Sequence, residues 1–457
     1  MNPKQSGRRR FLKEGAALAL LSHPVAQSLR AAGQGAGGLA GLALGGIRSA
    51  SGQTVGPETT EVRPKDWYAY GERSRFENSV RIGTNGFYGR DQKPGVPRDY
   101  GFRTPLQRSV GILTPAPLHF VIAHGYDPPD TDPRQYRLLI HGLVDRPLIF
   151  TLEELERLPS VSRIHFVECA GNSAPSGAGF APGAARIAPT ATAQQTHGLT
   201  SCSELTGVPL SLLLREAGVK QGASWIVAEG AEGGKHTKSI PLEKAMDDIL
   251  VAYGQNGEPV RPEQGYPLRL LVPGWEGINN VKWLKRIKVV DQPYMGMLES
   301  TKYPSLRVDG KSRWFQFEMG PKSVITRPSG GQRLPSRGFY EITGLAWSGG
   351  GAVRRVEVST DGGRSWKDAE LQGPVHRIAH TRFRFPWNWD GEEAVLQSRC
   401  TDELGEVQPT ATELGQILGV HLDLDYFQSR PGTIVHFNAI QPWKVNRDGS
   451  VHNAIFS

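Results

Sequence analysis

The spacing of apolar and polar residues changes once along the chain, near residue 325. Between residues 60 and 320, short apolar runs alternate with segments of helical period, which predicts a domain of mixed helices and strands. From residue 338 onward, apolar and polar residues alternate at period two, and turn residues such as Asp361-Gly362-Gly363 separate the segments. This second pattern predicts an all-β sandwich of roughly 100 residues. A chain of 457 residues is long enough for two or three domains.

The mixed region contains several local signals for helix and strand ends. Thr151 and Glu154 have the spacing of a capping box at a helix start, and Pro209 is suited to the first turn of a second helix. Pro273-Gly274 would stop a buried strand. The pattern therefore predicts strands over 135–144 and 266–275, and helices over 151–159 and 206–219.

Residues 1–54 differ from the rest of the chain. Three consecutive arginines, Arg8 to Arg10, precede Phe11-Leu12-Lys13 and a short apolar run, which is typical of a twin-arginine export signal. The low-complexity stretch 31–54 predicts a flexible spacer. The apolar run is too short for a stable membrane anchor, which needs about 18 residues. We therefore expect export to the periplasm and no membrane span.

Charge and cysteine content exclude several function classes. The net charge is +8, but the first 30 residues carry +5 of it, which leaves +3 on residues 31–457. So small an excess argues against nucleic acid as a partner and leaves room for an anionic ligand. The three cysteines, Cys169, Cys202 and Cys400, form no CxxC or CxxCH motif. This disfavours a disulfide framework, a zinc ribbon and a covalently attached c-type haem in this chain.

Cys169 follows a strand-like run and precedes the small-residue turn Ala170-Gly171-Asn172. A thiol in this position has three interpretations. It could be a buried structural cysteine, a nucleophile with His165 or another histidine as base, or a soft ligand to a metal that prefers thiolate.

The segment 263–289 is basic and contains several glycine turns. Arginine forks, lysine charges and free backbone N–H groups in such a loop can hold a phosphate. The alternative is an ordinary basic loop that faces solvent. The basic residues are Arg269, Lys282, Lys285 and Arg286.

Five motifs together point to a known family. Their order and spacing resemble the sulfite oxidase family of molybdenum-pterin enzymes over residues 105–420. The amino acids within the motifs are most similar to those of the molybdenum subunits of sulfane dehydrogenases. The motifs are ECAGN (168–172), TGVPL (206–210), GYPLRLLVPGWEG (265–277), VKWLKRI (281–287) and KSVITRPSGG (322–331).

The resemblance implies a fold and a division into domains. An α+β molybdopterin-binding catalytic domain, residues 60–322, would be followed by an immunoglobulin-like dimerisation domain, residues 323–425. The residues 426–457 would form a C-terminal tail that packs on this chain or on a partner. A homodimer within a larger hetero-oligomer is expected.

The resemblance also implies an activity and its partners. The protein would be a periplasmic enzyme that oxidises sulfane sulfur on the cysteine of a carrier protein. Electrons would pass to a separate c-type cytochrome subunit, because this chain has no haem motif. The alternative within the family is a sulfite:cytochrome c oxidoreductase.

Seven residues match family positions with a role. Cys169 matches the thiolate ligand of molybdenum and Tyr303 the active-site tyrosine, and both are expected to be catalytic. The remaining matches are cofactor contacts: His124 to the pterin, Arg269 and Lys282 to the pterin phosphate and ring edge, Gln264 where vertebrate members have histidine, and Glu232 near a family carboxylate.

The chain departs from sulfite-oxidising members at places where they carry arginine. Ile122 stands two residues before His124, and Ser173 and Ala174 follow the CAGN turn. Losing these arginines removes charge-assisted hydrogen bonds that a sulfite dianion would use. Free sulfite is therefore expected to bind poorly, whereas a sulfur atom on a carrier arm would fit.

Two alternative functions lie outside this chemistry. One is a cysteine hydrolase that uses Cys169 with His165, and the other is a binding module that has lost its metal. His376 and His380 are four residues apart, but they lie in a β-patterned region without other ligands. We interpret this pair as structural.

Overall fold

The computed structural model describes residues 70–84, 101–123, 127–175, 187–306, 309–423, 426 and 436–455. Residues 79–457 belong to one compact unit, and Ala17–Asn78 form a second. Of the second unit, the described residues 70–78 contain a turn in which the Glu77 N–H donates to the Ser74 carbonyl at 2.9 Å. The export signal and spacer, residues 1–54, lie outside the described residues, as does His124. The account below concerns the larger unit.

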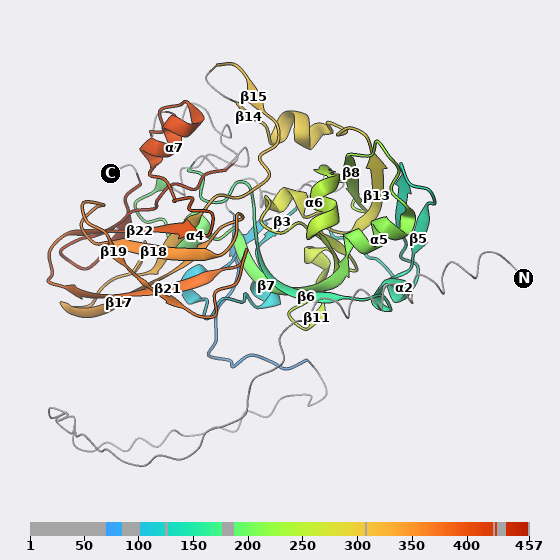
Figure 1. Ribbon diagram of the computed structural model, residues 1–457. Coiled ribbons are helices and arrows are strands. Elements are labelled where there is room, and N and C mark those ends of the chain that lie inside the picture. The colour runs from blue at the N-terminus through green and yellow to red at the C-terminus, as the bar shows by residue number, and fades with distance from the viewer. Residues whose placement is uncertain are drawn as a thin grey trace, which may run out of the picture. The chain divides into compact units, whose positions relative to one another are not determined.

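Among the described residues that precede residue 300, the strands form three sheets (Figure 1). The first has the order β1-β2-β3, with strands Ile82–Gly83, Gly101–Arg103 and Val121–Ile122. The second has the order β11-β10-β7-β6, and β12 pairs with β10; the strands are Glu258–Pro259, Leu250–Gln255, Thr200–Pro209, Val161–Glu168 and Arg269–Leu271. The third has the order β5-β4-β13-β8-β9, with strands Leu148–Phe150, Leu138–Gly142, Leu284–Val290, Trp225–Gly230 and Thr237–Pro241.

Short helices connect these strands. Among the described residues they are α2 (Leu152–Glu156), α4 (Ala193–His197), α5 (Leu210–Ala217) and α6 (Leu242–Asp247). The predicted capping box is present, since the Thr151 hydroxyl accepts from the Glu154 N–H and the Glu154 carboxylate accepts from the Thr151 N–H. Pro209 is the N-cap of α5 and not its first residue, and the helix ends at Gly218 in the left-handed region. The predicted strand 266–275 is shorter, since β12 covers Arg269–Leu271.

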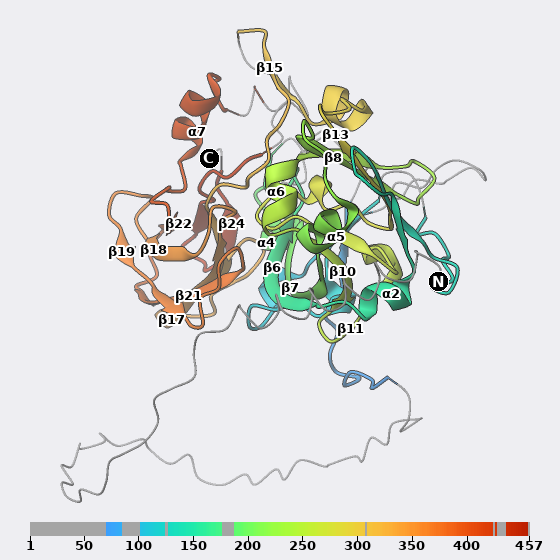
Figure 2. The same ribbon diagram turned by 45° about the vertical axis from the view of Figure 1, so that its right-hand side comes forward.

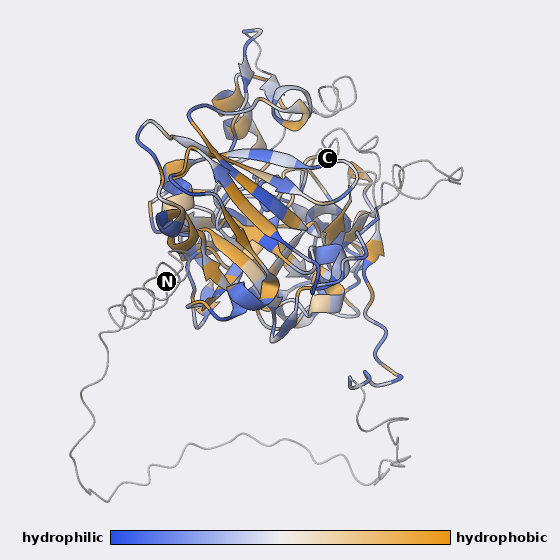
Figure 3. Ribbon diagram, turned by 90° about the vertical axis from the view of Figure 1, so that its right-hand side faces the viewer, coloured by the Kyte–Doolittle hydropathy of each residue, from blue (hydrophilic) through white to orange (hydrophobic). Residues whose placement is uncertain are grey.

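Beyond residue 320, the described strands form a sandwich of two antiparallel sheets. The first has the order β16-β17-β21-β20, with strands Lys322–Arg327, Gly338–Trp347, Thr381–Trp389 and Glu370–Gln372. The second has the order β19-β18-β22-β23-β24, with strands Lys367–Asp368, Val353–Ser359, Ala394–Asp402, Trp443–Val445 and Val451–Asn453. The helix α7 (Ala411–Leu418) precedes β23, and the small hairpin β14 (Ser305–Leu306) and β15 (Ser312–Arg313) precedes β16. Figure 3 shows apolar residues along the strands and many polar residues in the connections.

The tail predicted over 426–457 contributes to the sandwich. Its strand β23 pairs with β22 through Leu396 and Trp443, and β24 closes the sheet. Trp443 is fully buried, and its indole N–H donates to the Ile325 carbonyl at 3.1 Å. The described part of this segment therefore packs on its own chain, where it adds two strands to the second sheet of the sandwich.

The strands β6 and β7 lie beside the sandwich in both Figures 1 and 2. The Phe166 N–H donates to the Ile378 carbonyl at 3.0 Å, and the Phe166 ring lies 6.4 Å from Trp347. Phe166 shares an apolar core with sandwich residues. One face of β6 therefore packs on the sandwich. None of the described helices is long and apolar enough to cross a membrane.

Candidate cofactor pocket

A cavity of about 460 Å³ lies between elements of the first three sheets. Its walls come from β3, the end of β6, the β8–β9 loop, β12, the segment just before β13 and the π-helix Leu298–Lys302. Six residues with a role predicted from the sequence line this cavity, although they come from distant parts of the chain. They are Cys169, Glu232, Gln264, Arg269, Lys282 and Tyr303.

Cys169 is the residue directly after β6, as the sequence predicted. Its N–H donates to the Leu199 carbonyl and its carbonyl accepts from the Asn172 N–H, both at 2.9 Å. The side chain is 8 % exposed and packs with Phe120 and Val167, and Ile122 packs against the same cluster. The thiol is thus held at the end of a paired strand, in largely apolar surroundings.

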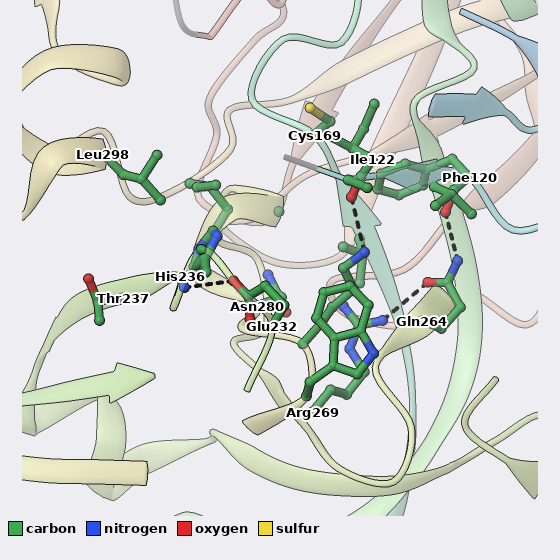
Figure 4. Close-up of a pocket in the computed structure, with 18 of the residues that line it drawn as sticks. Phe120, Ile122, Cys169, Glu232, His236, Thr237, Gln264, Arg269, Asn280 and Leu298 are labelled. Atoms are coloured by element: carbon green, nitrogen blue, oxygen red, sulfur yellow. Dashed lines mark hydrogen bonds between the residues drawn. The ribbon is translucent and has the colours of Figure 1, made fainter. Parts of the chain in front are cut away.

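Arg269 and Gln264 form one end of the pocket. Figure 4 shows a chain of hydrogen bonds in which the Arg269 guanidinium donates to Gln264 Oε1 at 3.3 Å and Gln264 Nε2 donates to the Phe120 carbonyl at 2.9 Å. Burial lowers the pKa of Arg269 to about 10, so it remains a cation at neutral pH. Its buried Nε has no hydrogen-bond partner among the described residues. This arginine therefore has a donor to spare for a ligand.

Lys282 brings a second nitrogen to the same end. Its Nζ donates to the carbonyls of Ile122 and Glu263, each at 3.0 Å, and lies 4.4 Å from the centroid of the Trp283 ring. Burial, followed by the charge of Arg269, lowers the pKa of Lys282 to about 7. An anionic ligand in the pocket would favour the ammonium form.

Glu232 also lines the pocket and lies in the loop between β8 and β9. Its Oε1 accepts from the His236 N–H at 2.6 Å, and its buried Oε2 has no partner among the described residues. Burial raises the pKa of this carboxyl group. Glu232 can therefore accept a hydrogen bond from a ligand, or donate one when protonated.

Tyr303 follows the π-helix, and its N–H donates to the Leu298 carbonyl at 3.1 Å. The side chain is 5 % exposed and packs with Ala170, Ile278 and Leu298. Ala170 belongs to the turn that follows Cys169. The tyrosine and the thiol therefore approach the cavity from neighbouring surfaces.

Two of the polar lining residues that the sequence analysis missed are His119 and Asn280. His119 is buried, and burial together with the charge of Arg269 lowers its pKa to about 3, so its ring is neutral. Its Nδ1 lies 3.2 Å from the Phe120 carbonyl, which places the proton on Nδ1. Asn280 is also buried, and its Oδ1 accepts from the Val272 N–H. Each of these residues stands alone in the sequence, outside any motif or periodic pattern that would distinguish it from an ordinary loop residue.

The three departures from the sulfite-oxidising pattern have different surroundings. Ile122 lines the pocket. Ser173 and Ala174 do not: the Ser173 hydroxyl donates to the Phe437 carbonyl at 2.5 Å, and Ala174 packs with Phe437 and Leu414. Of the three positions without arginine, only Ile122 therefore belongs to the pocket wall. Ser173 and Ala174 face the C-terminal segment.

The histidines that were considered for other chemistry lie elsewhere. His165 is absent from the pocket lining, and its Nδ1 lies 3.3 Å from the Ile378 carbonyl. Burial lowers the pKa of His165 to about 4. His380 is buried with its Nε2 3.0 Å from the Thr200 hydroxyl, whereas His376 is half-buried. These contacts support the structural interpretation of the pair and give His165 no place beside the pocket.

The donor set fits a metal that arrives with most of its own ligands. Within the described part of the chain, no group of three or more His, Cys, Asp or Glu side chains is placed to hold a metal ion. The pocket offers a single thiol, at Cys169, as a soft ligand. Its far end offers the unpartnered Arg269 Nε and the Lys282 ammonium to an anion. A molybdenum ion carried by an organic phosphate-bearing pterin matches both features.

Buried charged groups lie behind the pocket wall. Lys238 Nζ is 3.8 Å from Glu299 Oε1 and 5.9 Å from the centroid of the Tyr303 ring. Glu276 is 2 % exposed, and burial raises its pKa to about 8 although the Lys238 ammonium opposes the shift. A carboxyl group whose pKa is higher in the folded state takes up a proton on folding, so its contribution to stability falls as pH rises from about 4.5 to about 8.

Replacing Glu276 should remove this pH dependence. We expect the melting temperature of metal-free Glu276→Gln to exceed that of the wild type by more near pH 7.5 than near pH 5.5. Calorimetry at the two pH values measures the difference. The exposed Glu153→Gln is the matched control and should leave the difference near zero. An equal gain at both pH values would contradict a protonated Glu276.

Two regions of this chain match families of known proteins. Residues 124–298 match the model of an oxidoreductase molybdopterin binding domain, and residues 313–429 match that of a Mo-co oxidoreductase dimerisation domain. The crystal structure of the sulfane dehydrogenase SoxCD from Paracoccus pantotrophus superposes with a TM-score of 0.76 and 38% identity, covering 88% of this chain and 97% of that chain.

Plant nitrate reductases match the chain over a smaller share of their length. Nitrate reductase [NADH] 1 of Arabidopsis thaliana is 36% identical over 329 residues, which are 64% of this chain and 34% of the relative. Nitrate reductase [NADH] 2 of Phaseolus vulgaris is 34% identical over 345 residues, 67% of this chain and 37% of the relative. The chain thus spans about a third of these enzymes.

The pocket, its single thiol and the two matched domains lead to one assignment. A molybdopterin-binding domain implies the molybdenum cofactor, and the sandwich is the dimerisation domain that accompanies it. The likeness to a solved structure covers nearly all of that structure. The chain belongs to the sulfite oxidase family of molybdopterin oxidoreductases.

Proposed function

We propose that this enzyme oxidises sulfane sulfur attached to the cysteine of a carrier protein and passes the electrons to a c-type cytochrome. The observation that carries the proposal is the apolar wall beside the thiol. Cys169 packs with Phe120 and Val167, and Ile122 packs against them. A doubly charged sulfite would lack charge-assisted hydrogen bonds at this wall, whereas a neutral or singly charged sulfur chain loses less on leaving water. The likeness to a sulfane dehydrogenase supports the same choice.

Each residue of the pocket then has a task. When bound, the cofactor supplies two-electron redox chemistry and oxygen-atom transfer. Cys169 would ligate its metal, and Arg269 and Lys282 would bind its anionic end. Tyr303 would donate a hydrogen bond near the reacting oxygen. Each oxygen added to sulfur derives from water, so two protons and two electrons leave for every oxygen.

Export and assembly belong to the same proposal. The leader motif at Arg8-Arg9-Arg10 would direct the protein to the periplasm, where carrier proteins and c-type cytochromes would be accessible. The dimerisation domain suggests a homodimer, to which a cytochrome subunit would bind. The alternative activity is direct oxidation of sulfite.

Substrate comparison tests the proposal. Protein purified from cells that make molybdopterin should contain about one molybdenum per chain and reduce a c-type cytochrome with persulfidated carrier protein. Free sulfite should give a much lower kcat/KM, and nitrate should not be reduced. A higher kcat/KM for sulfite would favour the alternative activity. Wild-type protein that contains no molybdenum would contradict the assignment as a molybdenum oxidoreductase.

A Tyr303→Phe variant should lower kcat by about 100-fold, because one hydrogen-bond donor to the reacting oxygen contributes about that much. The ring, which packs on Ala170 and Leu298, is kept, so the molybdenum content should not change. Steady-state kinetics and metal analysis measure both quantities. Tyr294→Phe, at a half-exposed tyrosine outside the pocket lining, is the control. Equal kcat in the two variants would show that the Tyr303 hydroxyl has no catalytic role.

A further inference from the structure

A buried cluster links the residue before Cys169 to the sandwich. Glu168 is 0 % exposed, and its carboxylate accepts from Lys322 Nζ at 2.5 Å on Oε1 and from Trp347 Nε1 at 2.7 Å on Oε2. Lys322 and Trp347 face each other on the paired strands β16 and β17. Because directly paired residues project to the same face of a sheet, the sandwich presents two donors to the two oxygens of one carboxylate.

The same carboxylate also fixes the turn that carries the thiol. Asn172 Nδ2 donates to Glu168 Oε1 at 2.9 Å, and Asn172 Oδ1 accepts from the Leu199 N–H at 3.0 Å. Lys322 Nζ donates a second hydrogen bond, to the Ser173 hydroxyl at 2.8 Å. Ser173 has a φ of 61°, a left-handed conformation that is uncommon for a serine. The Lys322 side chain therefore contacts residues on both sides of Cys169 in the sequence, Glu168 before it and Ser173 after it.

The backbone is closely packed on its other side. A Cβ atom at Gly277 would lie 2.6 Å from the Glu168 carbonyl oxygen and 3.3 Å from the Cys169 Cα. This glycine allows the 3₁₀ turn Gly277–Asn279 to contact the thiol-bearing segment directly. The segment is thus enclosed between that turn and the sandwich donors, with little space for movement.

We propose that Lys322 and Trp347 are positioning residues that set the direction in which Cys169 presents its sulfur to the cofactor. They act through Glu168 and Asn172 and line no part of the pocket. The dimerisation domain therefore also completes the metal site of its own chain. The consequence for molybdenum rests on the proposed function, whereas the placement of the thiol does not.

The placement is tested without metal. Cys202 and Cys400 are fully buried, so iodoacetamide should react with Cys169 alone in the folded, metal-free protein. Trp347→Phe removes one hydrogen bond and no charge, and alkylation of Cys169 at fixed pH should become about fivefold faster as the turn opens more often. Trp443→Phe removes a comparable indole hydrogen bond from the same sandwich, to the Ile325 carbonyl, and should keep the wild-type rate. Equal rates for the two variants would overturn the proposal.

A second measurement distinguishes positioning from simple stabilisation. In the molybdenum-loaded enzyme, the g-values of the Mo(V) electron paramagnetic resonance signal report the orientation of the thiolate. They should shift in Trp347→Phe and stay unchanged in Trp443→Phe, even where both variants melt at a lower temperature. Wild-type g-values in Trp347→Phe would contradict the role at the metal. Wild-type protein without molybdenum would instead contradict the proposed function, and the alkylation rates would still decide the placement.

Discussion

A Cys169→Ser variant is expected to purify with little molybdenum and with kcat lowered by at least about 100-fold. The pocket offers the metal one thiol, and no other cluster of metal-ligating side chains exists among the described residues. A serine hydroxyl is a harder ligand that stays protonated near neutral pH, so it replaces a thiolate poorly. Changes to residues that only support a ligand already cost about 10- to 100-fold, and loss of the ligand should cost more. Elemental analysis and pterin fluorescence measure the loss.

The control for this variant is another buried cysteine. Cys400 lies on β22 in the sandwich core, and Cys400→Ala should keep its molybdenum although the protein melts at a lower temperature. Full metal content and full activity in Cys169→Ser would exclude Cys169 as the ligand. Loss of metal in both variants would point to unfolding and not to ligation.

Breaking the buried ion pair behind the thiol should have the largest effect on stability. Lys322 and Glu168 are both 0 % exposed, and their charged atoms lie 2.5 Å apart. Lys322→Met leaves the Glu168 carboxylate buried without its cation, and we expect a loss of about 3–5 kcal/mol in the free energy of unfolding. The double variant Lys322→Met with Glu168→Gln should recover much of this loss, because no uncompensated charge remains. Denaturant unfolding of the metal-free proteins measures both.

An exposed ion pair gives the matched comparison. Lys444 and Glu393 lie 3.2 Å apart on the sandwich surface, with 37% and 53% of their side chains exposed. Lys444→Met should cost less than about 1 kcal/mol, because solvent screens the pair. A similarly small cost for Lys322→Met would contradict the expected penalty for removing the cation of a buried ion pair.

Local signals in the sequence predicted local structure well. The capping box at Thr151 and Glu154 depends on residues three apart, so the signal and the structure occupy the same few residues. The period-two pattern after residue 338 predicted the sandwich for the same reason, since each strand shows its own alternation. The pocket is different: its residues, from His119 to Tyr303, are far apart in the chain, and spacing alone could not predict that they meet. The family resemblance supplied that grouping.

Long-range contacts account for what the sequence analysis missed. The strands β23 and β24 are three residues each, too short to show a period, and their pairing with β22 fixes them. Ser173 and Ala174 follow the thiol in sequence, but a left-handed Ser173 turns them toward Phe437 and away from the cavity. Glu168 and Lys322 are 154 positions apart in the sequence, so no local pattern predicts that they form an ion pair.

The late position of β23 and β24 in the chain affects how the protein matures. During synthesis, the segment with Glu168 and Cys169 leaves the ribosome well before Lys322 and Trp347, and β23 and β24 follow after every other described strand. Domains fold in the order in which they are made. The carboxylate beside the thiol therefore has no cation while the first domain emerges alone. If Cys169 ligates the metal as proposed, a nascent chain would acquire a rigid metal site only after the sandwich has been translated, and we expect cofactor insertion to be a late event.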